Sequence, residues 1–199
     1  MEKIYETAYA KINLGLDVLG KRSDGYHEVR MVMQSVGLSD AVEIEEGEGL
    51  VVETDHSGLA GGPDNLAWKA AELLARCCGK IPNVHIRLNK KIFLAAGLAG
   101  GSSDAAAVMR GLSRLWQLDL TAPELEKLAA ELGSDIPFCI TGGTALAEGR
   151  GEILTELPEA PELLLVLAKP KLEVATGWVY GNFRQQKVNQ RPDIDGIIK

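Results

Sequence analysis

A stretch rich in glycine, alanine and serine at residues 96–107 (AGLAGGSSDAAA) is the part of this sequence best suited to bind an anion. Glycines let backbone N–H groups approach a ligand without an intervening Cβ atom. The serines open an alanine-rich segment that we expect to be helical, and the first amides of a helix have no partner within it. These amides and the positive end of the helix dipole favour a phosphate group. A flexible strand-to-helix connection with a serine cap is the alternative interpretation.

Lys11, Asn13 and Asp135 are polar residues that could act on a ligand held there. Lys11 and Asn13 lie two positions apart in an alternating segment, so both side chains would project from one face of a strand. Asp135 follows a predicted helix end and precedes a proline, where a carboxylate could serve as a general base. Two simpler interpretations stay open: Lys11 and Asn13 could line a solvated strand edge, and Asp135 could cap the next turn.

The DGYH segment at residues 24–27 combines a turn dipeptide with an aromatic ring and an imidazole. Tyr26 could stack on a flat heterocycle while His27 bonds to its edge, and a hairpin turn with a surface histidine would explain the same residues. His56 and His85 lack a metal-like spacing with each other or with a cysteine. We therefore expect these two histidines to be structural or solvated.

The composition is that of a soluble globular protein. The chain has 199 residues, a net charge of -7, 46% hydrophobic and 25% charged residues, which argues against disorder. The acidic balance disfavours binding to nucleic acid. No apolar run approaches the roughly 20 residues that span a bilayer, and the N-terminus lacks the pattern of a signal peptide. Three cysteines without a CxxC spacing predict reduced thiols in a cytoplasmic protein, and the oligomeric state is left open.

Hydrophobic periodicity predicts an α+β protein, because hairpins and helices follow one another without a regular strand-helix-strand order. Alternating apolar residues predict strands at residues 11–18, 29–33 and 84–88. Two short apolar segments flank a Gly-Glu-Gly turn and predict a hairpin, at residues 42–44 and 50–52. Apolar residues at helical spacing, with an Asp64 cap and a Thr121–Glu124 capping box, predict helices at residues 65–78, 103–118 and 121–132.

A composition shift at residues 158–161 (PEAP) predicts a domain boundary. We expect residues 1–158 to form one domain and residues 159–199 to begin a second, incomplete one. Beyond the boundary, the apolar run at residues 163–167 predicts a buried strand, and residues 175–184 predict a short helix. A buried strand of this kind needs neighbouring strands and a covering layer.

Four motifs occur in the order that is typical of the GHMP kinase superfamily, and the chain resembles that superfamily over essentially its whole length. They are AKINL at 10–14, DGYHE at 24–28, GLAGGSS at 97–103 and GSDIPF at 133–138. The resemblance implies a GHMP kinase N-terminal domain (ribosomal protein S5 domain 2-like) with the beginning of a ferredoxin-like C-terminal domain. The first two motifs, with VATGWVY at 174–180, resemble the branch whose substrate is a cytidine diphosphate-linked methylerythritol of the non-mevalonate isoprenoid pathway.

The resemblance also implies a role for each motif in the phosphorylation of that substrate's 2-hydroxyl by ATP and Mg²⁺. The glycine-rich loop would hold the ATP phosphates with Phe93, Leu94, Ala95, Ala96, Gly97, Leu98, Ala99, Gly100, Gly101, Ser102 and Ser103. Asp135 would be the catalytic base, and Lys11 would hold the carboxylate and the transferring phosphoryl group in register. The substrate would contact Asn13, Tyr26, His27, Thr176 and Tyr180, with cytosine between the two tyrosines. The resemblance assigns no Mg²⁺ ligand.

The sequence departs from the family pattern in two places. Phe93 stands where a proline is usual, and Ala95, Ala96 and Ala99 stand where glycines are common, so the loop should be stiffer. Family members also continue past Lys199 into a second domain with another glycine-rich motif, so we expect this 199-residue chain to bind nucleotide weakly and to show little turnover. Two alternatives stay open: another GHMP kinase that acts on a different alcohol, or a non-catalytic nucleotide-binding fragment.

Overall fold

The computed structural model describes residues 3–172, 174–184 and 188–199, and its strands form one six-stranded sheet. The strands are β1 (Lys3–Lys21), β2 (His27–Glu46), β3 (Leu50–Thr54), β4 (Val84–Asn89), β5 (Thr144–Glu148) and β6 (Ile153–Glu156). The helices are α1 (Leu66–Cys77), α2 (Gly100–Leu115), α3 (Ala122–Ala129), α4 (Ile136–Thr141), α5 (Thr176–Asn182) and α6 (Ile194–Ile198). This mixture confirms the predicted α+β class.

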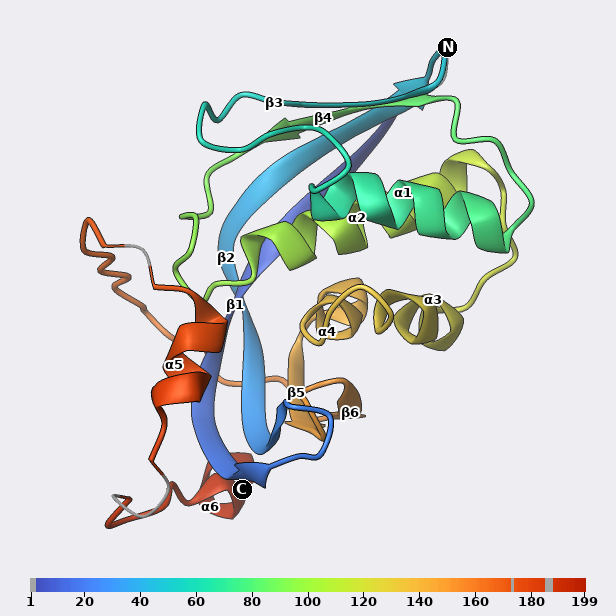
Figure 1. Cartoon of the computed structure of the whole chain (residues 1–199). Coiled ribbons are helices and arrows are strands. Elements are labelled where there is room, and N and C mark those ends of the chain that lie inside the picture. The colour runs from blue at the N-terminus through green and yellow to red at the C-terminus, as the bar shows by residue number, and fades with distance from the viewer. Residues whose placement is uncertain (1–2, 173, 185–187) are drawn as a thin grey trace.

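Two long strands, β1 and β2, form an antiparallel hairpin that runs along the molecule (Figure 1). The second edge of β2 is also paired, because β4 bonds to its C-terminal half and β5 to its N-terminal half. β6 extends the sheet beyond β5, and β3 lies parallel to β4 at the other end. Both parts of the sheet are therefore joined through β2.

The predicted alternation of β1 is wrong in detail, because three register shifts interrupt its pairing with β2. A bulge adds one residue to a strand, so the side chains beyond it exchange faces. One shift lies between Tyr9 and Lys11, and Lys11 is buried although the alternation placed it on the polar face. Leu16, which the alternation placed on the apolar face, is 37% exposed. The alternative interpretation, in which Lys11 lines a solvated strand edge, is therefore wrong.

The predicted hairpin between residues 42–44 and 50–52 is also wrong, because β4 lies between the two segments. The C-terminal half of β2 pairs with one edge of β4 in antiparallel orientation, and β3 pairs with the other edge in parallel. Parallel neighbours need a crossover connection, which α1 supplies between β3 and β4. The apolar pattern alone does not distinguish a hairpin from two strands that a third one separates.

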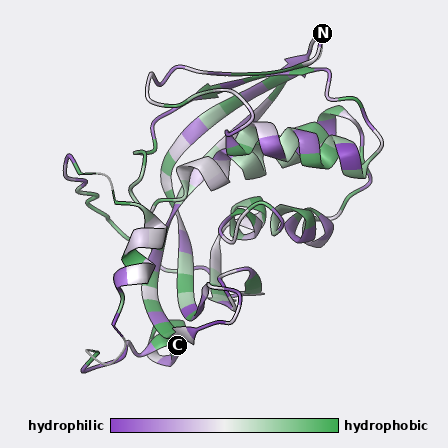
Figure 2. Cartoon of the chain, viewed as in Figure 1, coloured by the Kyte–Doolittle hydropathy of each residue, from purple (hydrophilic) through white to green (hydrophobic). Residues whose placement is uncertain are grey.

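Helices α1 to α4 lie on one side of the β1–β2 hairpin, and α5 lies on the other side in the view of Figure 1. The apolar faces of α1 and α2 pack against the hydrophobic bands of the strands (Figure 2) and form the main core. The cap of α1 is Asn65, whose side chain accepts from the Ala67 N–H, and not the predicted Asp64. The predicted capping box of α3, Thr121 with Glu124, is confirmed. No helix in the described ranges has the length and apolar content needed to cross a membrane.

The described residues between β6 and α5 form neither helix nor strand. The predicted buried strand at 163–167 is therefore wrong: Leu164 is 99% and Val166 is 95% exposed. A strand needs partners for its N–H and C=O groups, and the described sheet places no strand beside this segment. The short helix predicted at residues 175–184 is confirmed as α5. The domain boundary at 158–161 stays a prediction.

The chain after β3 turns back so that Gly61 lies close to the backbone of Val52 in β3, and the neighbouring Gly62 provides a control for this close contact. A Cβ atom at Gly61 would lie 1.8 Å from the backbone oxygen of Val52, whereas one at Gly62 would have nothing within 4 Å. Val52 belongs to β3 and cannot move away without disturbing its pairing with β4. We expect Gly61→Ala to lower the free energy of unfolding by about 1–3 kcal/mol, and Gly62→Ala to change it by less than about 0.5 kcal/mol. Urea denaturation measures both, and equal stabilities would contradict the close approach.

Candidate active site

One large cavity of about 1550 Å³ collects the predicted site residues. Its walls come from β1, the β1–β2 turn, the loop before α2, the residue before α4 and the chain around α5. Drug-sized ligands occupy cavities of about 300–1,000 Å³, so this one has room for two nucleotide-sized molecules. Of the residues predicted for the site, Ser103 alone does not line the cavity.

Lys11 and Asp135 form an ion pair in this cavity, with Nζ 3.6 Å from Oδ2. The Lys11 side chain is 7% exposed and the Asp135 side chain 34%, so the amine is largely buried while the carboxylate is accessible to a ligand. Asn13 Oδ1 accepts a hydrogen bond from Lys11 Nζ at 3.4 Å. The backbone N–H of Lys11 donates to the Leu98 C=O at 3.1 Å, which joins the ion pair to the glycine-rich loop.

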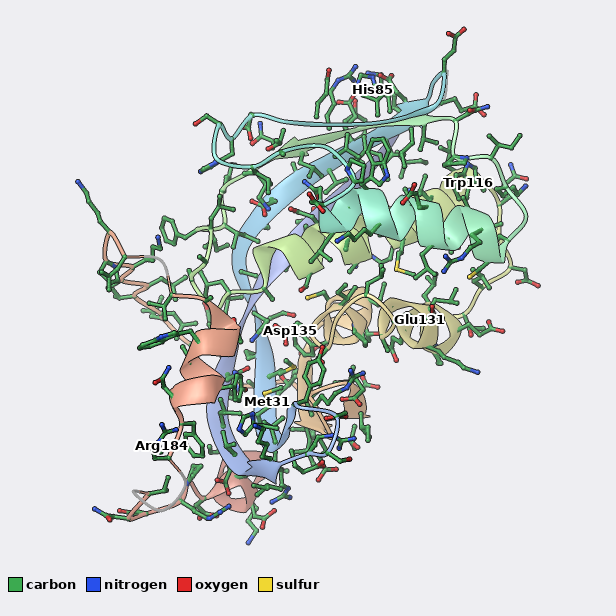
Figure 3. The ribbon with its side chains drawn as sticks, viewed as in Figure 1. Met31, His85, Trp116, Glu131, Asp135 and Arg184 are labelled. Atoms are coloured by element: carbon green, nitrogen blue, oxygen red, sulfur yellow. The ribbon has the colours of Figure 1, made fainter. Side chains whose placement is uncertain are left out.

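Asp135 directly precedes α4 but does not cap that helix with its side chain. The predicted alternative, a carboxylate that merely caps a turn, is therefore wrong. Figure 3 shows Asp135 between the β1–β2 hairpin and α4, near the middle of the molecule. The Asp135 carboxylate thus lines the cavity and does not accept a capping hydrogen bond from α4.

The charge of Asp135 acts on two neighbours. Burial, and then this charge, raises the pKa of the Cys139 thiol to about 12. Burial and the same charge also raise the pKa of the Tyr180 phenol above its ordinary value. Cys139 is therefore a neutral thiol at physiological pH and no nucleophile. Of the three groups, the Asp135 carboxylate is the one placed to accept a proton.

The glycine-rich loop turns through three left-handed positions before α2: Ala95 at φ 51°, Gly97 at φ 72° and Ala99 at φ 57°. Left-handed backbone costs a residue with a Cβ atom roughly 1–2 kcal/mol, so the two alanines are strained. α2 begins at Gly100, three residues before the predicted start, and Ala99 gives it no side-chain cap. The first amides of α2 are therefore available to an anion in the cavity.

Ser103 is a structural residue, and its predicted contact with phosphate is wrong. It is 1% exposed, and its hydroxyl donates to the Tyr9 C=O of β1 at 2.5 Å. Its N–H donates to the Ala99 C=O at 2.8 Å, so both of its donors are used inside the protein. Ser102 is partly exposed and lines the cavity, so its hydroxyl is the one that a phosphate can reach.

A buried cluster of Asp40, Lys90 and Asp104 ties β2 to both ends of the glycine-rich loop. Lys90 Nζ donates to Asp40 Oδ2 at 2.5 Å and to Asp104 Oδ2. Asp40 Oδ1 accepts from the N–H groups of Lys91 and, at 2.8 Å, of Ile92. The three side chains are at most 1% exposed. Burial raises the pKa of Asp104 to about 7, although the positive charge of Lys90 acts in the opposite direction.

Two ring contacts mark the other part of the cavity. His27 and Tyr180 stack with ring centroids 5.2 Å apart and planes at 28°. The Arg150 guanidinium, in the β5–β6 turn, lies 4.8 Å from the centroid of the Tyr26 ring. The predicted sandwich of a base between Tyr26 and Tyr180 stays a prediction. Thr176 lies at the first position of α5 and lines the same cavity.

Sequence reasoning missed Arg150 and the buried cluster. Asp40 and Asp104 lie 50 and 14 residues from Lys90 along the chain, and no local spacing connects them. A lysine that shortly precedes a glycine-rich loop was the one available signal. From the sequence, Arg150 is an ordinary turn residue between two glycines.

Comparisons with known proteins agree with this geometry. Residues 65–143 match the model of the GHMP kinases N terminal domain, a span that contains Lys90, Asp104 and Asp135. A 4-diphosphocytidyl-2-C-methyl-D-erythritol kinase of Acetivibrio thermocellus is 48% identical over 200 residues, 100% of this chain and 71% of the relative. A protein of the same name from a Synechococcus strain is 51% identical over 187 residues, 93% of this chain and 60% of the relative.

Solved structures show the same likeness. The crystal structure of a 4-(cytidine 5'-diphospho)-2C-methyl-D-erythritol kinase aligns with a TM-score of 0.77 at 34% identity, over 98% of this chain and 70% of that one. A mevalonate kinase aligns with a TM-score of 0.59 at 15% identity, over 77% of this chain and 56% of the other. At that identity the second likeness shows the fold alone.

Adjacent alanines in the loop allow a test of its strain. Ala95 has φ 51° whereas Ala96 has an ordinary φ and packs beside the small cluster of Ala10, Ile92 and Leu98. Ala95→Gly should raise the free energy of unfolding by up to about 1 kcal/mol, because relief of the strain exceeds the added chain entropy. Ala96→Gly should lower it by about 0.5–1 kcal/mol. Thermal or urea denaturation gives both values, and a loss of stability in both variants would show that Ala95 is unstrained.

The raised pKa of Asp104 predicts a pH dependence of stability. The folded protein keeps this proton up to about pH 7, whereas the unfolded chain releases it near the ordinary value of 3.8. The unfolded state therefore binds fewer protons in this interval, and the contribution of Asp104 to stability falls as pH rises, by at most about 1.4 kcal/mol per pH unit. Asp104→Asn removes the titrating group. The stability of the unaltered protein relative to this variant should be greater at pH 5 than at pH 8, and a constant difference would contradict the raised pKa.

Proposed function

Because this chain belongs to the 4-diphosphocytidyl-2-C-methyl-D-erythritol kinase family of the GHMP kinases, we propose that it transfers the γ-phosphoryl group of ATP to the 2-hydroxyl of 4-diphosphocytidyl-2-C-methyl-D-erythritol. That reaction belongs to the non-mevalonate pathway of isoprenoid synthesis. The observation that carries the proposal is the Lys11–Asp135 pair, which shares one cavity with a glycine-rich loop and an uncapped helix start. Phosphoryl transfer needs positioning and charge stabilisation more than covalent help, and this arrangement offers both.

In the proposed step, the 2-hydroxyl of the substrate loses its proton to the Asp135 carboxylate while its oxygen bonds to the γ-phosphorus. The bond between the γ-phosphorus and the β,γ-bridging oxygen breaks, and ADP leaves with that oxygen. Lys11 Nζ, 3.6 Å from Asp135 Oδ2, is close enough to hold both the attacking oxygen and the phosphoryl group beside the base. The largely buried position of Lys11 strengthens its interaction with the charge that develops there.

The phosphates of ATP are proposed to lie against the glycine-rich loop and the first turn of α2. Gly100, Gly101 and Ser102 line the cavity there, and the first N–H groups of a helix have no intrahelical partner. A Cβ atom added at Gly101 would meet only a leucine methyl group, at 3.5 Å, so a phosphate can approach the backbone of this glycine without obstruction. The positive end of the α2 dipole adds to the attraction.

Mg²⁺ fits this cavity as a companion of the ATP phosphates. In kinase sites Mg²⁺ is held mainly by phosphates, water and one or two protein oxygens. Within the described ranges, no three His, Cys, Asp or Glu side chains converge on a possible metal site. Two cavity carboxylates are already paired with arginines, Asp17 with Arg191 and Asp24 with Arg22. The Ser102 hydroxyl, beside the proposed phosphate position, is a candidate to complete the coordination, and the ion would neutralise charge on the phosphates.

The cytidine end of the substrate is proposed to lie between the β1–β2 turn and α5. The 5.2 Å between the His27 and Tyr180 ring centroids is less than the roughly 7 Å that two ring contacts of about 3.5 Å require. Cytosine therefore stacks on an outer face of this pair, or one of the two rings turns aside to admit it. Tyr26, Asn13 and Thr176 line the same cavity and supply a further ring and polar groups.

We further propose that the protein acts in the cytoplasm and that residues 1–158 form its nucleotide-binding domain. Cys77, Cys78 and Cys139 are all free, which supports a reducing compartment. The glycine-rich loop, Lys11 and Asp135 all lie before residue 158, whereas Thr176 and Tyr180 come after it.

Asp135→Asn tests the proposed base, because it keeps the shape of the side chain and removes the proton acceptor. We expect kcat to fall about 10²–10⁴-fold, with the affinity for a non-hydrolysable ATP analogue changed less than about two-fold. ADP release in the presence of the cytidylylated methylerythritol measures the first quantity, and calorimetry the second.

Glu131→Gln is the matched control, because Glu131 is an exposed carboxylate four residues earlier that does not line the cavity (Figure 3). It should leave kcat unchanged. Similar turnover in the Asp135 and Glu131 variants would show that Asp135 is not the base. ADP release with mevalonate or homoserine, but not with the cytidylylated substrate, would overturn the assigned substrate.

A further inference from the structure

Lys90 lies three residues before the proposed phosphate loop (residues 93–103), yet its side chain is buried and cannot reach a phosphate. A lysine beside a phosphate loop ordinarily offers its charge to the ligand. Here the Lys90 side chain is 1% exposed, Nζ is held by Asp40 and Asp104, and the residue does not line the cavity. The role of Lys90 must therefore come from what it holds together inside the protein.

The cluster joins three elements that meet at the loop. Asp40 lies on β2, Lys90 is the first residue after β4, and Asp104 lies in the second turn of α2. Asp40 also binds the N–H groups of Lys91 and Ile92, which lead into the loop. The entrance and the exit of the loop are thus fixed to one strand through a single ammonium group. A loop whose ends are held in this way has fewer conformations to lose on binding.

Contacts carry this restraint from the cluster to the amides that face the ligand. A Cβ atom at Gly100 would lie 3.6 Å from Lys90 Nζ and 3.0 Å from Ile92 Cγ2, so the first residue of α2 rests on the cluster. Ile92 packs with Leu98 in the small core under the loop, and the Leu98 C=O accepts from the Lys11 N–H. The cluster, the phosphate loop and the Lys11 backbone therefore form one connected unit.

We propose that Asp40, Lys90 and Asp104 are positioning residues that set the phosphate loop for ATP and have little influence on the cytidine end of the substrate. The cytidine end is proposed to lie between the β1–β2 turn and α5, whereas the hydrogen bonds of the cluster join Lys90 to Asp40 on β2 and to Asp104 on α2. The inference rests on the proposed function for the identity of the two ligands. Its structural part, the restraint of the loop, does not depend on either ligand.

Charge determines which variants can test the cluster. One ammonium group faces two carboxyl groups, and Asp104 Oδ1 is buried with no hydrogen-bond partner among the residues that the structure describes. Lys90→Met alone leaves two buried carboxyl groups without the ammonium group that both bond to, which destabilises a protein for reasons unrelated to the loop. The double variant Lys90→Met/Asp104→Leu removes the ammonium group together with one of the two carboxyl groups that it bonds to, and Asp40 keeps its backbone N–H partners. Lys91→Met is the matched control, because Lys91 is the adjacent lysine and its side chain is exposed.

The experiment compares three readouts in these variants: hydrogen exchange of the amides of residues 94–100 without ligand, affinity for a non-hydrolysable ATP analogue, and affinity for cytidine diphosphate. In the double variant we expect exchange about ten-fold faster and ATP-analogue affinity about ten- to hundred-fold weaker, with cytidine diphosphate affinity unchanged. Lys91→Met should match the unaltered protein in all three.

Unchanged exchange and unchanged ATP-analogue affinity in the double variant would overturn the inference. An equal loss of affinity for the ATP analogue and for cytidine diphosphate in the double variant would also overturn it. So would failure of the double variant to fold, because the cluster would then stabilise the whole fold and not the loop in particular. If the unaltered protein binds no ATP analogue, the proposed function fails. The exchange measurement still decides whether the cluster restrains the loop.

Discussion

Strand β2 is hydrogen-bonded along both edges, and the cavity depends on that double pairing. One edge holds β1, which carries Lys11, and the other edge holds β4 and β5, which lead into the glycine-rich loop and the Arg150 turn. Tyr26 and His27 stand at the start of β2, and Asp40 stands near the meeting point of β2 with β4. Segments far apart along the chain therefore reach one cavity because a single long strand places all of them.

Two lysines near the loop serve opposite purposes, and burial explains the difference. The buried Lys90 side chain pairs with Asp40 and Asp104 and does not reach the cavity. Its positive charge therefore interacts with groups inside the protein. Lys11 faces the Asp135 carboxylate, which is one-third exposed, so the electric field of the Lys11 ammonium group extends into the cavity beside Asp135. A charge in a low-dielectric interior acts strongly on near neighbours and must be compensated there. The charge of Lys90 is thus compensated inside the protein, whereas in the proposed function the charge of Lys11 also acts on the ligand.

Features that depend on a few neighbouring residues could be predicted from the sequence, and features that depend on distant partners could not. The capping box at Thr121 and the glycine-rich loop belong to the first kind, as does the placement of Asp135 after a helix end. The burial of Lys11 follows from a register shift against β2, and the position of β4 beside β2 follows from long-range pairing. The apolar run at 163–167 has the composition of a buried strand, but composition does not supply the neighbours that a strand requires.

In the proposed function, the alanines at left-handed positions affect how the loop binds phosphate. A glycine at such a position adopts many backbone conformations in the free protein and loses this conformational freedom when a phosphate binds. Ala95 and Ala99, at φ 51° and 57°, have few alternatives, so the loop holds one shape before binding. Binding of the proposed phosphate would then lose less conformational entropy, and the same rigidity would disfavour anions whose oxygens do not match the fixed amides. In this proposal, the backbone amides of the loop contribute to selectivity among ligands independently of the side chains that line the cavity.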